Sequence, residues 1–192
     1  MQAHSVLSEA ESAQLKARRD RPIRPRPPMS FVAPASLIDL AVAHLRGNGR
    51  DELEQLVLLG GYAGDERVLL VTLLLPETIA TWGRVEIVRS EQPKIVDWLY
   101  EHGQLLYVEA HTHGSGIDAE ELSCTDRKYP AGRTRGFIAI VVTHYAANGI
   151  DPRAFGMWEY EPPLWNRVPA RVAVERFRIV ADREIRDELL AD

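Results

Sequence analysis

The chain has a single cysteine, Cys124, among its 192 residues. One cysteine cannot form an internal disulfide, and it cannot build a cysteine-based zinc finger or a CxxC redox pair. Nucleobase-modifying zinc deaminases are excluded as well, because their PCxxC motif needs two cysteines. We expect Cys124 to be a small buried residue, and any bound metal to be held by histidines and carboxylates.

Long apolar runs are also missing. The densest run, Val68 to Leu75, has the length of a strand, whereas a helix that spans a bilayer needs about 20 apolar residues. The N-terminal residues lack the charged start and continuous apolar centre of a secretory signal. These absences predict a cytoplasmic protein that does not bind membranes.

An excess of positive charge is absent too. The net charge is -5, and neither a GxGxxG nor a GxxxxGK[ST] motif occurs, which argues against nucleic-acid binding and phosphate-loop nucleotide binding. The exception is the basic segment Lys16 to Arg26, which leads into Pro27 and Pro28 without apolar periodicity. We expect residues 1–30 to be a flexible basic, proline-rich segment, with docking onto an acidic partner as its alternative role, and residues 31–192 to form one domain.

Apolar periodicity predicts several helices and strands. The helices are expected at Ser36–Leu45, Pro93–His102, Leu122–Tyr129 and Arg183–Leu190. The strands are expected at Leu53–Gly61 and Arg67–Leu75, which form a hairpin, and at Gly83–Val88, Gln104–Thr112, Gly136–His144, Phe155–Tyr160 and Val172–Val180. Because strands and helices do not alternate regularly, the pattern favours an α+β fold with a mixed sheet flanked by helices.

The segment YVEAHTHG, from Tyr107 to Gly114, carries the first candidate ligands. Side chains alternate along a strand, so Glu109, His111 and His113 share one face. The two histidine Cα atoms lie about 7 Å apart, and both imidazoles can reach one ion. A hydrolytic zinc site uses three such protein ligands and keeps a fourth position for water.

A third ligand follows in the segment Ser123-Cys-Thr-Asp126. The Ser123 and Asp126 side chains lie on one side of a helix because they are three residues apart. The glycine-containing loop from Gly114 to Leu122 can turn this helix back toward the histidines. An HxH pair followed closely by SxxD is far more specific than HxH alone.

This combination resembles the signature of the JAB/MPN (JAMM) metalloproteases, a glutamate followed at a distance by HxHx7SxxD. The similarity extends to Glu54, which stands seven residues before Gly61 as the family glutamate does, and to Glu109, two residues before the first histidine. It spans residues 54–160. The chain departs from the family pattern in having nine residues between His113 and Ser123 instead of seven. Two single positions also differ, Gly114 where proline is usual and Val57 where glycine is frequent.

The resemblance implies a cytidine-deaminase-like JAB/MPN fold and a role for each matching residue. His111, His113 and Asp126 would bind Zn²⁺, Glu54 would be the general base and acid, and Ser123 would stabilise the oxyanion. Two roles remain open for Glu109, a contact that orients a ligand imidazole or a surface acid near the mouth of the site. Glu52 competes with Glu54 for the role of the base.

The resemblance also implies a reaction and its partners. Members of the family cleave peptide or isopeptide bonds after the C-terminus of ubiquitin or ubiquitin-like proteins. Bacterial relatives occur beside activating and conjugating enzymes, often in antiviral defence. We therefore expect a zinc-dependent, deubiquitinase-like metallopeptidase that processes a ubiquitin-like precursor or removes it from its conjugates.

Two alternatives stay open. A non-catalytic MPN scaffold would keep the fold and bind partners, although such proteins typically lose metal ligands. A cupin, a β-barrel that also binds metal through HxH, would use a later histidine such as His144. The expected helices and the long spacing before His144 do not suit that barrel.

Overall fold

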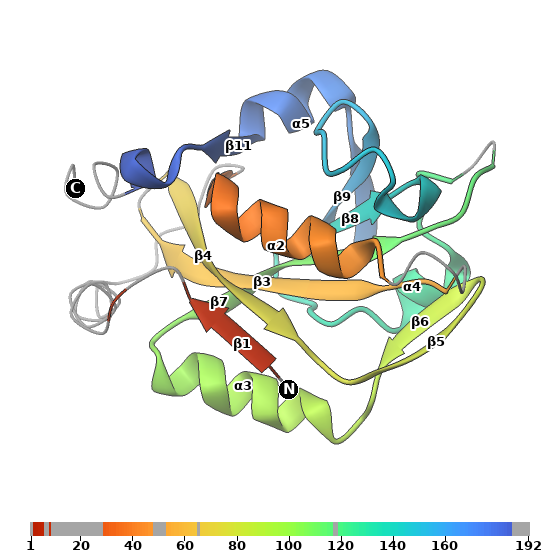
Figure 1. Ribbon diagram of the computed structural model, residues 1–192, viewed down its shortest axis with the longest axis horizontal. Helices are drawn as coiled ribbons and strands as arrows, with labels where there is room; N and C mark the ends of the chain where they lie inside the picture. Colours follow the sequence, from red (N-terminus) through yellow and green to blue (C-terminus); the bar gives the residue numbers. More distant parts are fainter. Residues whose placement is uncertain are drawn as a thin grey trace.

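A computed structural model describes residues 2–5, 8, 29–47, 53–64, 66–116 and 119–185 of the chain. The described residues form a curled mixed sheet of nine strands with helices packed on it (Figure 1). The order of the strands is β10 (Leu164–Val168), β9 (Phe155–Glu161), β8 (Ile138–Val142), β7 (Leu105–Thr112), β3 (Leu56–Ala63), β4 (Arg67–Leu75), β2 (Ser30–Pro34) and β11 (Phe177–Val180), and β1 (Gln2–Ser5) also pairs with β4. The pairs β7–β8, β2–β4 and β11–β2 are parallel and the others antiparallel. A mixed sheet with helices confirms the expected α+β class.

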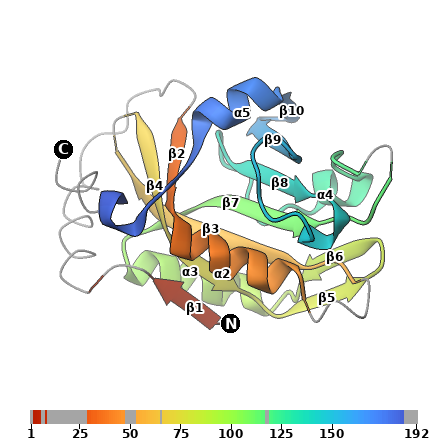
Figure 2. The ribbon, with the colours of Figure 1, turned by 45° about the horizontal axis from the view of Figure 1, so that its top comes forward.

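Alternating side chains on β3 divide the core between the two faces of the sheet. Val57 and Leu59 pack with the buried face of α2 (Ala35–Leu45), whereas Leu56 and Leu58 pack with α3 (Glu91–Glu101). The two helices therefore cover opposite faces (Figure 2). This division follows from the two-residue repeat of a strand.

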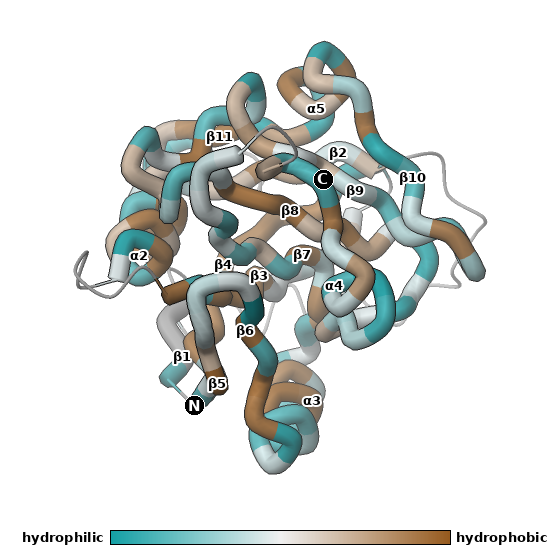
Figure 3. The backbone as a smooth tube through the Cα atoms, turned by 90° about the vertical axis from the view of Figure 1, so that its right-hand side faces the viewer, coloured by the Kyte–Doolittle hydropathy of each residue, from teal (hydrophilic) through white to brown (hydrophobic). Residues whose placement is uncertain are grey.

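Strand β7 uses the same alternation to present polar groups on the α3 side. Val108 and Ala110 belong to the core on the α2 side, so Glu109 and His111 point to the opposite face. Figure 3 looks at the end of the sheet where β7 lies between the hairpin β5 (Thr78–Thr81)–β6 (Arg84–Ile87) and the short helix α4 (Cys124–Lys128). The candidate ligands thus lie near the middle of the sheet.

Most expected elements are present with shifted ends, and one is wrong. The structure contains the hairpin β3–β4, but α3 begins at Glu91, two residues before Pro93. Proline is tolerated there because amides of the first helical turn have no partner within the helix. The strand expected at Val172–Val180 is instead the helix α5 (Ala170–Arg176) followed by β11. Its β-branched valines favour a strand, but the helix packs Ala173 into the core on the α2 side of the sheet.

The N-terminal end of the chain differs from the expectation. Residues 2–5 belong to the segment expected to be flexible, yet they form β1 and pair with β4. The basic run Lys16 to Arg26 lies outside the described residues. Of the expected C-terminal helix, residues 182–185 are helical and the rest lies outside the described part. The helices α2 and α3 have 11 residues each, and no described helix is long and apolar enough to cross a bilayer.

Candidate metal centre

Two elements bring three candidate ligands together. His111 lies in β7, His113 follows the end of that strand, and Asp126 lies in α4. The Asp126 Oδ2 atom is 3.5 Å from Nε2 of His111 and 3.5 Å from Nε2 of His113. One possible ligand atom from each residue lies within 4.8 Å of the other two. The structure therefore assembles the predicted group of two imidazoles and one carboxylate.

The His111 ring is the most enclosed member of this group. The residue is 1% exposed, and neither ring nitrogen makes a hydrogen bond of normal geometry with the described residues, although carboxylate oxygens of Glu109 and Asp126 lie 3.3 Å and 3.5 Å from them. Buried polar atoms are normally satisfied, so two such nitrogens on one ring need an explanation. A metal ion bound at Nε2 supplies one, and the donor set suits a divalent cation. These three residues could hold a metal ion.

The charges at the site compensate one another. Burial acts to lower the pKa of His111, but the carboxylates of Asp126 and Glu109 outweigh burial and raise it to about 10. Burial acts to raise the pKa of Asp126, but His111 and His113 outweigh it and hold that pKa well below its usual range. The site therefore favours a positive charge between the imidazoles and the carboxylate, which a divalent cation also provides.

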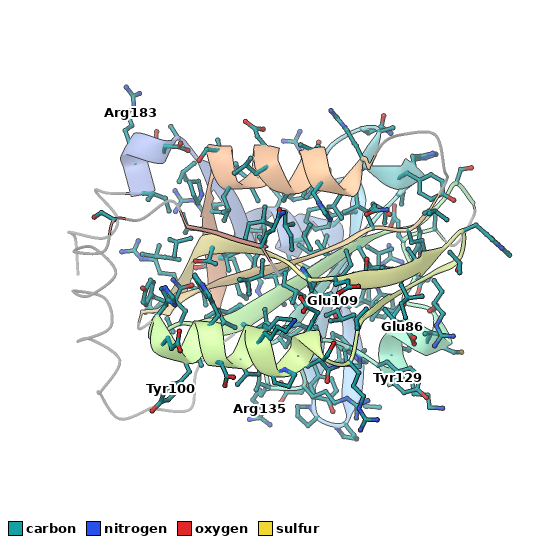
Figure 4. All side chains as sticks on the ribbon, turned by 60° about the horizontal axis from the view of Figure 1, so that its bottom comes forward. Glu86, Tyr100, Glu109, Tyr129, Arg135 and Arg183 are labelled. Carbon is teal, nitrogen blue, oxygen red and sulfur yellow. The ribbon has the colours of Figure 1, made fainter. Side chains whose placement is uncertain are left out.

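Glu109 contacts the ring of His111 on the side away from Asp126. Its Oε1 atom is 3.3 Å from His111 Nδ1, and its Oε2 atom accepts a 2.7 Å hydrogen bond from the Ala131 amide. Glu109 is 5% exposed and lies inside the molecule, whereas Tyr129 lies at the surface (Figure 4). The surface-acid alternative for Glu109 is therefore wrong. A carboxylate at this position orients the imidazole and raises its basicity.

Ser123 caps the helix that carries Asp126. Its Oγ atom accepts a 3.2 Å hydrogen bond from the Asp126 amide, and its own amide donates to Asp126 Oδ2 at 2.7 Å. This reciprocal capping box fixes the direction of the carboxylate. The same oxygen faces both imidazoles. Ser123 has an extended backbone and precedes the helix, so its side chain meets Asp126 through the capping box and not through the helical repeat that was expected. Cys124, expected to be buried, is exposed because it starts a surface helix.

Glu54 lies just before β3, on the other side of β7 from α4. Leu56 is opposite His111, and the Thr112 amide donates to the Gln55 carbonyl, so continuing this register places Glu54 opposite His113. Glu54 is 4% exposed. Burial raises its pKa to about 7, although the nearby His113 and His111 charges partly oppose this. The competing Glu52 lies outside the described residues.

A strained turn after β8 supports the backbone of His113 and was not expected. Residues 144–146 all have positive φ, between 49° and 58°, a left-handed conformation that is rare without glycine. The Tyr145 amide donates to the His113 carbonyl at 3.0 Å. A Cβ atom at Gly114 would lie 3.0 Å from the Tyr145 hydroxyl, so a side chain at this position would require a small shift of the Tyr145 ring. No sequence motif indicated this turn.

His144, the later histidine of the cupin alternative, is exposed and does not belong to the metal-ligand group. Within the described residues the strand order runs from β10 to β11 without closing into a barrel. The cupin alternative is therefore wrong.

Comparison with known proteins indicates the fold but no family. No protein-family model matches the chain, and no curated protein matches it. Among solved structures, it is similar to the solution structure of protein DSY2949 from Desulfitobacterium hafniense, with a TM-score of 0.56 and 12% sequence identity. The match covers 79% of this chain and 93% of that chain. At this identity the likeness shows a shared fold alone.

Proposed function

We propose that the chain is a zinc-dependent metallopeptidase of the JAB/MPN (JAMM) type. One observation supports the proposal: the HxH and SxxD segments converge on one point. The buried carboxyl of Glu54 is near enough to that point for the charges of His113, His111 and Asp126 to affect its pKa. The mixed sheet between helices is compatible with a JAB/MPN fold. His111, His113 and Asp126 would hold the ion. Bound Zn²⁺ would supply a Lewis acid and lower the pKa of its water toward about 7.

The residues around this point have the properties that amide hydrolysis needs. With a pKa of about 7, the Glu54 carboxyl can accept a proton and return it near neutral pH. It would take the proton of the attacking water and give it to the leaving amine. Ser123 Oγ accepts its hydrogen bond from Asp126, so its hydroxyl hydrogen remains free to donate to the oxyanion.

The substrate class follows from the resemblance of the sequence. The proposed substrates are a ubiquitin-like protein precursor or its conjugates, cleaved after the C-terminus of that protein. Activating and conjugating enzymes of a cytoplasmic, bacterial antiviral pathway would be its functional partners. A non-catalytic scaffold is not favoured by any observation at the site, because all three ligands and Glu54 are present.

The decisive experiment combines metal analysis with hydrolysis. Protein purified without chelators should contain one zinc ion per chain. It should cleave a ubiquitin C-terminal fluorogenic amide or an isopeptide-linked ubiquitin dimer, lose that activity with a chelator, and regain it with Zn²⁺. A chain that neither contains zinc nor binds it on titration would overturn the proposal. Bound zinc without hydrolysis of either probe would favour the scaffold.

A further inference from the structure

The helix that carries Asp126 is too short to be stable by itself. Helix α4 has five residues, all of them described, and none is fully buried. Isolated helices shorter than about 12 residues are marginal even with good sequences. Asp126 nevertheless stays 3.5 Å from both imidazoles. Contacts outside α4 must therefore hold the helix against β7.

The first of these contacts is a close approach of the preceding loop to the sheet. A Cβ atom at Gly156 of β9 would lie 2.0 Å from the Glu120 carbonyl oxygen. Gly156 is opposite Val141, and Val141 is opposite His111, so this approach occurs on the ligand-bearing face. Only glycine leaves room for the loop there.

A tryptophan holds the loop from the same strand. The Nε1 atom of Trp158 donates a 3.1 Å hydrogen bond to the Glu120 carbonyl. Leu122, directly before the cap of α4, is 4% exposed and packs with Trp158 and Val141. These contacts anchor the chain on the sheet immediately before Ser123.

An arginine of the edge strand β10 completes the arrangement. The guanidinium of Arg167 donates to the carboxylates of both Glu120 and Glu121, and its Cζ lies 5.9 Å from the centre of the Trp158 ring. Arg127 of α4 lies 5.1 Å from the same ring centre and donates to the Leu122 carbonyl at 3.2 Å. The loop is thus held by its backbone, by its acidic side chains and through α4 itself.

We propose that Gly156, Trp158 and Arg167 form a loop clamp whose role is to position Asp126 for metal binding. They act through the loop at residues 119–122 and are positioning residues. The metal-affinity part of this inference rests on the proposed function, whereas the ordering of α4 does not.

Arg167→Ala is the most informative variant. The Arg167 side chain is 43% exposed, and exposed ion pairs contribute little to stability, so the fold should persist. Arg135→Ala is the matched control, because Arg135 forms a 2.7 Å ion pair with Glu161 of β9 and none with the loop. Arg167→Lys should recover part of the effect, since an ammonium group lacks the planar fork that binds two carboxylates. Trp158→Phe removes the indole donor together with part of the ring surface that packs on Leu122.

Two measurements test the clamp separately from the proposed function. In the metal-free protein, the backbone amides of residues 122–129 should exchange hydrogen faster in Arg167→Ala and Trp158→Phe than in the wild type. The amides of β7 should exchange at the wild-type rate. Zn²⁺ affinity, measured by competition with a chromophoric chelator, should fall by up to about 5-fold in Arg167→Ala, the size expected from loss of exposed ion pairs, and stay unchanged in Arg135→Ala.

Unchanged exchange in Arg167→Ala would overturn the clamp. Faster exchange with wild-type Zn²⁺ affinity would overturn its role in positioning Asp126. A wild-type chain that binds no Zn²⁺ would overturn the proposed function, and the role in metal binding with it. The exchange data would still decide whether the clamp orders α4.

Discussion

The candidate ligands come from two regions with different mechanical support. The histidines belong to β7 and the residue after it, and β7 has hydrogen-bonded neighbours, β3 and β8, on both sides. Asp126 belongs to a short surface helix that depends on a capping box and on contacts of the preceding loop. Variants near β7 should therefore change the chemistry of the site, whereas variants near α4 should change where the carboxylate lies.

The largest effect is expected from substitution of the ligands themselves. The two regions should differ in whether the substitution also changes hydrogen exchange in α4. His111→Ala and Asp126→Ala should each abolish Zn²⁺ binding and hydrolysis, because two protein ligands do not make a stable site. Asp126→Ala should also speed hydrogen exchange in α4, since it removes half of the capping box. Asp126→Asn keeps an oxygen for the Ser123 amide and should leave that exchange slow. Equal exchange in the two Asp126 variants would contradict the capping argument.

Glu54→Gln should separate catalysis from metal binding. The amide cannot accept a proton, so hydrolysis should fall by about 100-fold to 10,000-fold. The zinc content should stay that of the wild type. Steady-state kinetics and metal analysis on the same preparation measure both. Loss of the metal in this variant would make Glu54 a ligand or a structural residue.

Ser123→Ala tests the α4 region by removing the side chain that caps the helix. Loss of a donor to the oxyanion should lower the rate of hydrolysis by on the order of 100-fold to 1000-fold. Loss of the cap should lower the free energy of unfolding by about 1 kcal/mol, measured by denaturant titration. Ser123→Asn restores a capping acceptor but presents a different donor, so it should recover stability more than activity. Recovery of both together would mean that Ser123 acts through the helix alone.

Glu109→Gln tests whether the Glu109 carboxylate supports His111 as a metal ligand in the β7 region. The amide keeps the size of the side chain but weakens the contact with His111 Nδ1, so Zn²⁺ affinity should fall by about 10-fold to 100-fold. Chelator competition measures this change. Exchange in α4 should be unaffected, in contrast to Arg167→Ala. A variant with wild-type affinity would show that Glu109 does not support the ligand.

The smallest effect is a pH dependence of stability. The pKa of Glu54 is raised from 4.5 to about 7 in the folded state, so between these values the folded chain holds more protons than the unfolded one. The contribution of Glu54 to the free energy of unfolding therefore falls as the pH rises through this window. Glu54→Gln lacks this loss. As the pH rises from about 5 to about 8, the free energy of unfolding of the metal-free variant should therefore increase relative to that of the wild type by on the order of 1 kcal/mol. Parallel pH profiles from denaturant titration would contradict the raised pKa.

Local patterns in the sequence determined a large part of the fold and of the site. Alternation along Tyr107 to His113 predicted that Glu109 and the two histidines share a face, because a strand repeats every two residues. The three-residue spacing of Ser123 and Asp126 predicted that the two side chains lie together, although the structure joins them by a capping box and not by the helical repeat. A single cysteine restricted the candidate ligands to histidines and carboxylates.

Tertiary structure alone decided how these parts meet. The register between β3 and β7 places Glu54 opposite His113, and no local pattern records a register between separate strands. The ion pair of Arg167 and Glu121 joins residues 46 positions apart, and the close approach at Gly156 depends on the path of a loop from elsewhere in the chain. Local periodicity reports which side chains share a face, whereas long-range packing decides what that face contacts.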